Sequence, residues 1–170
     1  MKEIEYKRFK SLKHLTLDDI YNNLSSVVNI LDFNIANVIE CEAPVTLNTL
    51  KARMREAFDV AKISQNALDI IMDRINKMGY YYEEECFDIV LWPKKGKFNV
   101  NYLRINSDRL IYDIPKDEFK NLVLSFDSEG EELKREVLGY FGLIRLTEKA
   151  NEYIDYVKKH TGNMSIDENK

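Results

Sequence analysis

The chain has 170 residues, of which 45% are hydrophobic and 32% charged, and its formal net charge is −4. This composition is typical of a globular protein with one core, or with one core and a smaller satellite. It excludes a membrane-spanning chain, because no segment approaches the roughly 20 apolar residues of a membrane helix, and two cysteines exclude a disulfide framework.

Residues 1–31 are predicted to be a polar lead followed by a helix. Residues 1–15 favour a flexible or partly ordered terminus, with an electrostatic arm as the alternative. The terminus is charged and has no apolar run behind it, so we expect no secretory signal and a cytoplasmic protein. A helix is predicted from Thr16, its N-cap, to about Leu31, and a further helix over Phe33 to Cys41.

The stretch from Pro44 to Trp92 predicts a winged helix-turn-helix within a domain spanning residues 32–112. A short strand precedes a helix over Leu47 to Ala57, and a second helix covers Ser64 to Met78 with Ser64 as N-cap and Gly79 as its stop. The period then changes to that of a β-hairpin, Tyr80–Glu83 with Phe87–Trp92. Helix, turn, helix and hairpin in this order define the predicted fold.

Residues 113–161 predict a helical subdomain with three helices, and residues 162–170 a disordered tail. Pro115 is expected at the first position of a helix that runs to about Phe126. The others are expected near Ser128–Tyr140 and Thr147–His160, while Phe98–Ile114 is predicted to be extended chain. The predicted fold class is therefore α+β, with an N-terminal helical extension, a winged helix-turn-helix and a C-terminal three-helix subdomain.

The charge is unevenly distributed along the sequence. Residues 44–112 carry eleven basic and nine acidic side chains, whereas the segments before and after them are net acidic. Nucleic-acid binding draws much of its affinity from Lys and Arg near phosphates. The predicted winged helix is thus the one segment of this chain whose charge favours such binding, and only by two units.

No motif for catalysis, metal or cofactor binding is found. Gly96-Lys97 is followed by Phe98 and lacks the upstream glycine of a phosphate-binding loop, so no ATPase site is expected. Glu83, Glu84 and Glu85 are consecutive in a hairpin, where neighbouring side chains point apart, and a solvated tip is favoured over a metal site. Neither cysteine has a histidine in a common motif. We expect a protein that is not an enzyme.

Several runs of residues resemble a bacterial domain of unknown function found at the C-terminus of large helicase-related ATPases of superfamily I or the AAA class. The domain often lies beside a restriction-endonuclease-like nuclease domain. The resemblance covers roughly residues 33–160. It rests on the order and spacing of the following runs: Val38–Val45, Leu50, Arg53–Arg55, Phe87–Pro93, Arg104, Arg109, Ile114–Glu118, Glu132–Leu133 and Leu138–Arg145.

This resemblance implies a winged-helix accessory module of DNA-processing proteins, with a helicase or nuclease as protein partner and no catalytic residues to carry over. The chain departs from the family at two places. Ala43 stands where the family typically has glycine, and the loop Val60–Ile63 lacks an arginine-glycine pair before the second helix. Lys62 is the residue there that would replace the arginine.

The nucleic-acid hypothesis places the second helix in the major groove of DNA. Gln65 and Asn66, at its N-terminal end, would read base edges. Asp69 and Asp73 lie on the same exposed face and would repel phosphate. The residues expected to contact phosphates are Arg53, Arg55, Lys62, Lys77, Lys94, Lys95 and Lys97.

The alternative is a protein-docking winged helix that does not bind DNA and whose acidic face meets a basic partner. The positions of five arginines discriminate between the two hypotheses: Arg53, Arg55, Arg74, Arg104 and Arg109. If they gather with Lys94–Lys97 on one exposed face, DNA binding is favoured. If they pair with acids on a mixed surface, docking is favoured.

Overall fold

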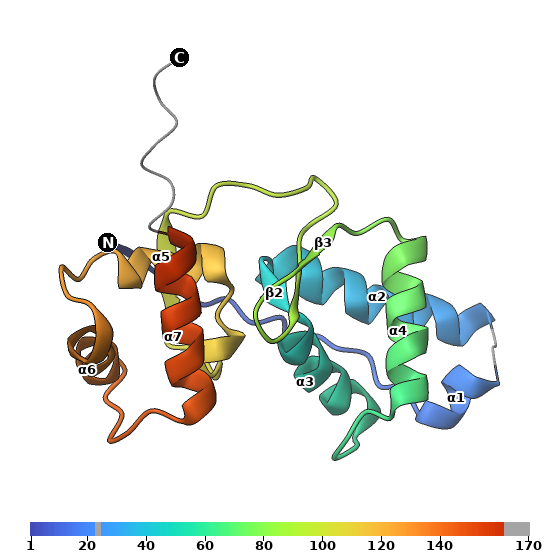
Figure 1. The fold of residues 1–170 in the computed structure, drawn as a ribbon. Helices are drawn as coiled ribbons and strands as arrows, with labels where there is room; N and C mark the ends of the chain where they lie inside the picture. Colours follow the sequence, from blue (N-terminus) through green and yellow to red (C-terminus); the bar gives the residue numbers. More distant parts are fainter. Residues whose placement is uncertain (23–24, 162–170) are drawn as a thin grey trace. The chain divides into compact units, whose positions relative to one another are not determined.

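The structure is a computed structural model that describes residues 1–22 and 25–161 (Figure 1). These residues form a mixed α+β protein with seven α-helices and two small sheets, one parallel and one antiparallel. No helix among them is long and apolar enough to cross a membrane.

The chain divides into two compact units, which are described separately. One is the Lys7–Phe98 unit, and the other, here called the split unit, consists of Met1–Tyr6 with the chain from Asn99 onward. The domain boundaries after residues 31, 112 and 161 are a different division and stay predictions. The tail predicted over residues 162–170 lies outside the described residues.

The Lys7–Phe98 unit contains four helices and a three-stranded antiparallel sheet in the order β2-β4-β3. Its sheet pairs Val45 with Leu91 and Glu83 with Val90. The elements are α1 (Leu17–Tyr21), α2 (Ser25–Glu42), β2 (Val45–Thr46), α3 (Leu47–Phe58), α4 (Gln65–Lys77), β3 (Tyr82–Glu84) and β4 (Ile89–Leu91). The predicted strand, helix, helix and hairpin are therefore present in the predicted order.

Local signals at the ends of α3 and α4 explain why these helices begin and end where they do. Thr46 and Ser64 are N-caps whose hydroxyls accept from the N–H groups of Thr49 and Ala67. Gly79 follows α4 with φ +75°, the left-handed conformation expected of it, and Asp59 ends α3 with φ 51°.

The predicted division of the first helices is wrong. Thr16 does cap a helix, with Asp19 completing a capping box, but α1 ends at Tyr21. A single α2 then runs from Ser25 to Glu42, so residues 32 and 33 lie inside a continuous helix. Its buried side chains, among them Val27, Leu31 and Ile35, recur at helical spacing, and the predicted break at residue 32 had no glycine or proline to cause it.

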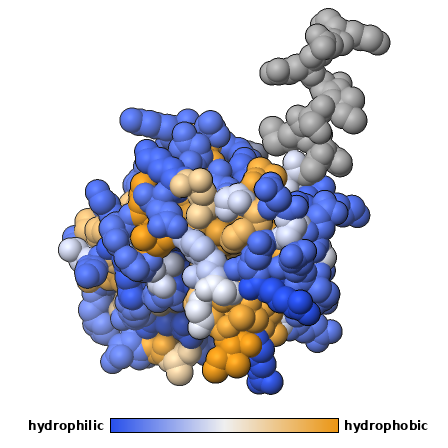
Figure 2. Space-filling view, turned by 90° about the vertical axis from the view of Figure 1, so that its left-hand side faces the viewer, coloured by the Kyte–Doolittle hydropathy of each residue, from blue (hydrophilic) through white to orange (hydrophobic). Residues whose placement is uncertain are grey.

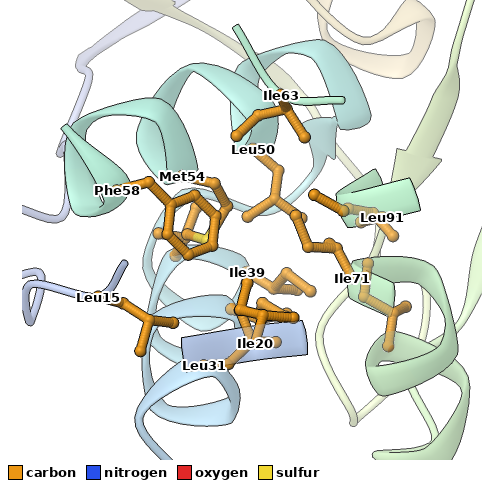
Figure 3. Packing of buried hydrophobic residues seen from close by; sticks show 14 of the residues in the cluster. Leu15, Ile20, Leu31, Ile39, Leu50, Met54, Phe58, Ile63, Ile71 and Leu91 are labelled. Atoms are coloured by element: carbon orange, nitrogen blue, oxygen red, sulfur yellow. The ribbon is translucent and has the colours of Figure 1, made fainter. Parts of the chain in front are cut away.

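The core of the Lys7–Phe98 unit is built by α2, α3 and α4 together with β4. Figure 3 shows side chains from these elements directed toward one another, with Phe58 and Met54 of α3 close together. Leu50, Ile71 and Leu91 are fully buried at its centre. The apolar stripes predicted for α3 and α4 thus face one common core, which fixes the orientation of their polar faces.

Residues 7–15 are pinned along this core rather than free. The side chain of Asn34 accepts from Lys13 N–H at 2.8 Å and donates to Lys13 C=O at 2.7 Å. Phe9 N–H donates to Glu42 at 3.0 Å, and Leu15 N–H donates to Ala57 C=O at 2.9 Å. The sequence predicted a flexible or partly ordered terminus, and over residues 7–15 the structure shows an ordered one. The polar partners that order it come from residues distant in sequence.

The split unit begins with a strand that the sequence did not predict. β1 (Lys2–Glu5) pairs in parallel with β5 (Tyr102–Ile105). The unit continues with the 3₁₀ turn Ile111–Asp113 and the helices α5 (Lys116–Val123), α6 (Gly130–Tyr140) and α7 (Glu148–Thr161). The three predicted helices are thus confirmed, with Pro115 as N-cap of α5 rather than its first residue.

The second edge of β5 is covered by side chains of α5 instead of a strand. Asn121 Nδ2 donates to the carbonyls of Val100 and Tyr102 at 3.1 and 3.0 Å. Glu118 Oε1 accepts from Arg104 N–H at 2.7 Å. Backbone groups that would be open in a two-stranded sheet are therefore satisfied by helix side chains.

Glu118 also holds two buried arginines. Its carboxylate accepts from Arg104 Nε at 2.9 Å and from both terminal nitrogens of Arg109 at 2.8 Å. The Tyr6 ring lies 4.3 Å from the Arg109 guanidinium carbon. Burial alone would raise the pKa of Glu118, but the hydrogen bonds and charges of Arg109 and Arg104 together outweigh it and lower the pKa.

Glu118→Gln is expected to lower the free energy of unfolding by about 3 kcal/mol at neutral pH, because it leaves two buried guanidiniums without their counter-charge. The pKa of Glu118 is lower in the folded chain than its ordinary value of 4.5. The contribution of Glu118 to the free energy of unfolding is therefore fully present above pH 4.5. It is lost as the pH falls through the lower pKa of the folded chain. Urea denaturation should show that the difference in unfolding free energy between variant and wild type shrinks as the pH is lowered below 4.5.

Glu132→Gln is the matched control, because Glu132 is exposed on α6. It should leave unfolding nearly unchanged at both pH values. If Glu118→Gln lowered the free energy of unfolding equally at neutral and acid pH, Glu118 would not be acting as the charged partner of the two arginines.

Candidate nucleic-acid interface

Arg53, predicted to contact phosphate, is a buried structural residue. Its side chain is 1% exposed and its Nε and terminal nitrogen donate to Glu42, itself fully buried, at 3.1 Å. A guanidinium enclosed between α2 and α3 is not available to an external phosphate. Because its position on α3 faces the core, Arg53 does not belong to the candidate surface.

Three of the other four arginines are likewise paired with acids. In the Lys7–Phe98 unit, Arg74 forms a bidentate salt bridge with Asp32. Its Nε donates to Oδ1 at 2.8 Å and its Nη2 donates to Oδ2 at 2.6 Å. In the split unit, Arg104 and Arg109 both hold Glu118. Arg104 and Arg109 are buried, and the Arg74–Asp32 pair is partly exposed. Arg55 alone of the five is exposed without an ion pair among the described residues.

Arg55 belongs to a surface hollow that we call the basic hollow. It is about 310 Å³ in volume and lies between α3 and the connection to α4. Its lining residues are Asn48, Lys51, Ala52, Arg55, Ala61, Lys62 and Ile63. Three cations and no acid line it, and none of the three cations has an ion-pair partner in the described parts of the chain.

The local fold brings these three cations together. Lys51 and Arg55 are four residues apart on α3 and so share one face of the helix. The left-handed Asp59 then turns the chain back, and Val60 N–H donates to Arg55 C=O at 3.0 Å. Lys62 thereby returns to the same face, just before the N-cap of α4. The flanking acid Glu56 is paired with Arg8.

Gln65 and Asn66 follow the basic hollow in the first turn of α4, and both are exposed as predicted. Gln65 Nε2 donates to Asp69 Oδ1 at 2.8 Å, so its amide is already engaged, whereas Asn66 has no side-chain partner among described residues. One turn on, Asp73 pairs with Lys77 at 2.7 Å. The exposed face of α4 is therefore mixed, and Lys77 is tied to an acid.

The lysine run after the hairpin is not part of the basic hollow. Lys97 Nζ bonds Glu83 at 2.7 Å and lies 5.0 Å from the Trp92 ring centroid. Lys94 Nζ lies 5.3 Å from the Tyr80 ring centroid. Lys95 is exposed and has no ion-pair partner within the described ranges. One hairpin acid, Glu83, thus neutralises part of the positive charge predicted to contact phosphate.

Lys51 is the one cation of the hollow's lining that the sequence-based prediction lacks. The residues expected from the sequence to contact phosphates do not include it. Its spacing of four from Arg55 is the available signal, because residues i and i+4 lie side by side on a helix. What the sequence could not show is that the loop carrying Lys62 folds back onto that face.

The described residues contain no group of three or more His, Cys, Asp or Glu side chains placed to hold a metal ion. Searches against protein-family models, curated proteins and solved structures returned no match for the chain.

Arg53→Ala and Arg55→Ala form a matched pair that separates a structural arginine from a surface one. Arg53→Ala should lower the free energy of unfolding by about 3–5 kcal/mol, because Glu42 is left buried and unpaired. Arg55→Ala should change it by less than about 0.5 kcal/mol. Urea denaturation measures both, and similar losses for the two variants would contradict the assignment of their roles.

Proposed function

We propose that the chain is a non-catalytic accessory module that binds nucleic acid through a winged helix-turn-helix. The order α2, β2, α3, α4 and then the β3–β4 hairpin supports that fold for the Lys7–Phe98 unit. In such a fold the second helix of the pair and the turn before it are the parts that approach DNA. Here the turn carries Lys62 and leads into α4.

The observation that carries the proposal is the basic hollow. Lys51, Arg55 and Lys62 converge on one concavity without an acid in its lining. Cations that no protein carboxylate neutralises are available to phosphate oxygens, and releasing counterions from DNA then favours binding. The hollow adjoins the α4 N-terminus, where N–H groups and the helix dipole also favour an anion.

The charge balance limits what kind of binding is proposed. The Lys7–Phe98 unit has thirteen basic and thirteen acidic side chains, so it has no long-range attraction for DNA. Asn66 is the side chain best placed to reach a base edge, since Gln65 is engaged by Asp69. We therefore propose contacts chiefly to the backbone, with a dissociation constant of about 10⁻⁴–10⁻⁶ M.

Protein docking without DNA is the second candidate, and a specific observation favours it. Asp69 and Asp73 lie on the exposed face of α4, and Glu84 and Glu85 on the hairpin, where they would repel a phosphate backbone. A basic surface of a partner protein would meet these groups favourably. The two candidates therefore use different parts of the same unit.

The cellular setting is proposed from the resemblance to the helicase-associated bacterial domain. On that basis the partner is a helicase or nuclease of a cytoplasmic DNA-processing system, and this chain supplies no catalytic residue. The basic hollow supports this role because an accessory module needs only to hold a strand near the motor or nuclease.

The test is fluorescence anisotropy of labelled duplex, forked and single-stranded DNA at low and physiological salt. The variant Lys51→Ala/Arg55→Ala/Lys62→Ala should weaken binding at least about tenfold and reduce the slope of log K against log salt by about one per phosphate contact removed. The slope reports how many phosphates the hollow neutralises.

Lys2→Ala/Arg135→Ala/Lys159→Ala is the matched control, since it removes two lysines and one arginine from exposed positions of the split unit. It should bind DNA nearly as wild type does. Equal losses of DNA affinity in both triple variants would mean that net charge alone matters. The basic hollow would then not be the binding site. Absence of binding at low salt would favour protein docking instead.

A further inference from the structure

The connection between α6 and α7 presents an isoleucine that no described residue covers. The side chain of Ile144 is 99% exposed, and that of the preceding Leu143 is 41% exposed. Single apolar residues are common on protein surfaces, so exposure alone indicates no function. The backbone that holds Ile144 and the charges beside it distinguish this position.

A helix-ending motif fixes the point at which Ile144 leaves α6. Gly142 has φ +63°, its N–H donates to Gly139 C=O at 3.1 Å, and Leu143 N–H donates to Leu138 C=O at 3.0 Å. These two bonds are the Schellman pattern, in which Leu143 takes the position that commonly contacts the last helical turn. Ile144 follows it and takes no part in the cap, so its exposed side chain is not needed to end α6.

Ile144 borders a hollow of about 250 Å³ between α6 and this connection, with Leu138 and Leu146 as apolar lining. Its charged lining is Arg135 and Arg145 together with Lys134 and the acid Glu131, which pairs with Lys134. Neither arginine has a hydrogen-bond or ion-pair partner among the described residues. Lys134, also in the lining, is engaged by Asp155 at 3.0 Å and Glu131 at 3.2 Å, and these bonds raise its pKa. Two guanidiniums thus remain available.

The charge of the two arginines differs from that of the split unit that carries them. Figure 2, which presents the side on which α6 lies in Figure 1, shows apolar patches bordered by hydrophilic side chains. The split unit as a whole is acidic, with twelve basic and sixteen acidic residues in its sequence. Two arginines without an ion pair in the described ranges, beside an exposed isoleucine, therefore form a local exception to this acidic character.

We propose that Leu143, Ile144, Arg135 and Arg145, here called the Ile144 patch, dock a segment of a partner protein that carries carboxylates next to apolar side chains. Arginine forms bidentate hydrogen bonds with carboxylates. Arginine next to buried apolar contacts is frequent at the energetic centre of protein interfaces. This surface lies in the split unit and is separate from the basic hollow.

The chemistry favours this occupant over two others. A second copy that docked the same patch onto itself across a two-fold axis would bring the arginines of both copies together, which is unfavourable. A membrane surface would gain only about 1 kcal/mol per arginine, too little for stable attachment with one isoleucine. A carboxylate-bearing apolar segment satisfies the arginines and covers Ile144 together.

The test is selection of displayed random peptides of about 12 residues on the full chain. Enriched peptides should combine Asp or Glu with Leu, Ile or Phe. One of them, synthesised with a fluorescent label, should bind Arg135→Gln/Ile144→Asp/Arg145→Gln at least about tenfold more weakly than wild type. Lys2→Gln/Leu110→Asp/Lys159→Gln is the matched control and should bind it as wild type does.

Because all three side chains changed in the patch variant are exposed, this variant should unfold at the wild-type temperature, and Ile144→Asp alone serves as a milder second variant. No enrichment, enrichment of basic peptides, or equal binding by wild type and both variants would overturn the proposal. Binding to phosphatidylglycerol vesicles that the variants lose, without any enriched acidic peptide, would overturn it in favour of a membrane.

Discussion

The Lys7–Phe98 unit depends on one buried ion pair. Glu42 ends α2, Arg53 lies in the middle of α3, and the same carboxylate accepts the backbone N–H of Phe9. Two helices and the N-terminal segment are therefore held by a single group that is withdrawn from water. Such a pair contributes little net stability compared with apolar residues, but it is costly to break, so it specifies one arrangement of these segments.

This use of charge inside the fold changes what the number of basic residues indicates. Counting arginines assumes that every guanidinium is a surface charge. Four of the five arginines that discriminate between DNA binding and docking instead pair with Glu42, Asp32 or Glu118. The positive charge left on the surface of the Lys7–Phe98 unit is carried mainly by lysines and Arg55. A short, convergent set of cations is thus more informative than the net charge of the segment.

Elements whose signals are local could be predicted from the sequence. Ser64, Thr46 and Gly79 mark the ends of α3 and α4 through bonds to neighbouring residues, and the apolar stripes place their faces. β1 could not be predicted, because its partner β5 lies about a hundred residues away and its pattern, Lys-Glu-Ile-Glu, has one apolar residue. Arg53 was misplaced for the same reason: its partner Glu42 lies on another helix.

The placement of β1 has a consequence for how the chain tolerates trimming. Met1–Tyr6 and the chain from Asn99 onward form one unit, so the Lys7–Phe98 unit is a continuous insertion within it. Proteolytic removal of the first six residues would spare every helix and strand of the insertion. It would, however, expose one edge of β5 and remove the Tyr6 ring from Arg104 and Arg109. Loss of the N-terminal residues would therefore destabilise elements in the C-terminal half of the sequence.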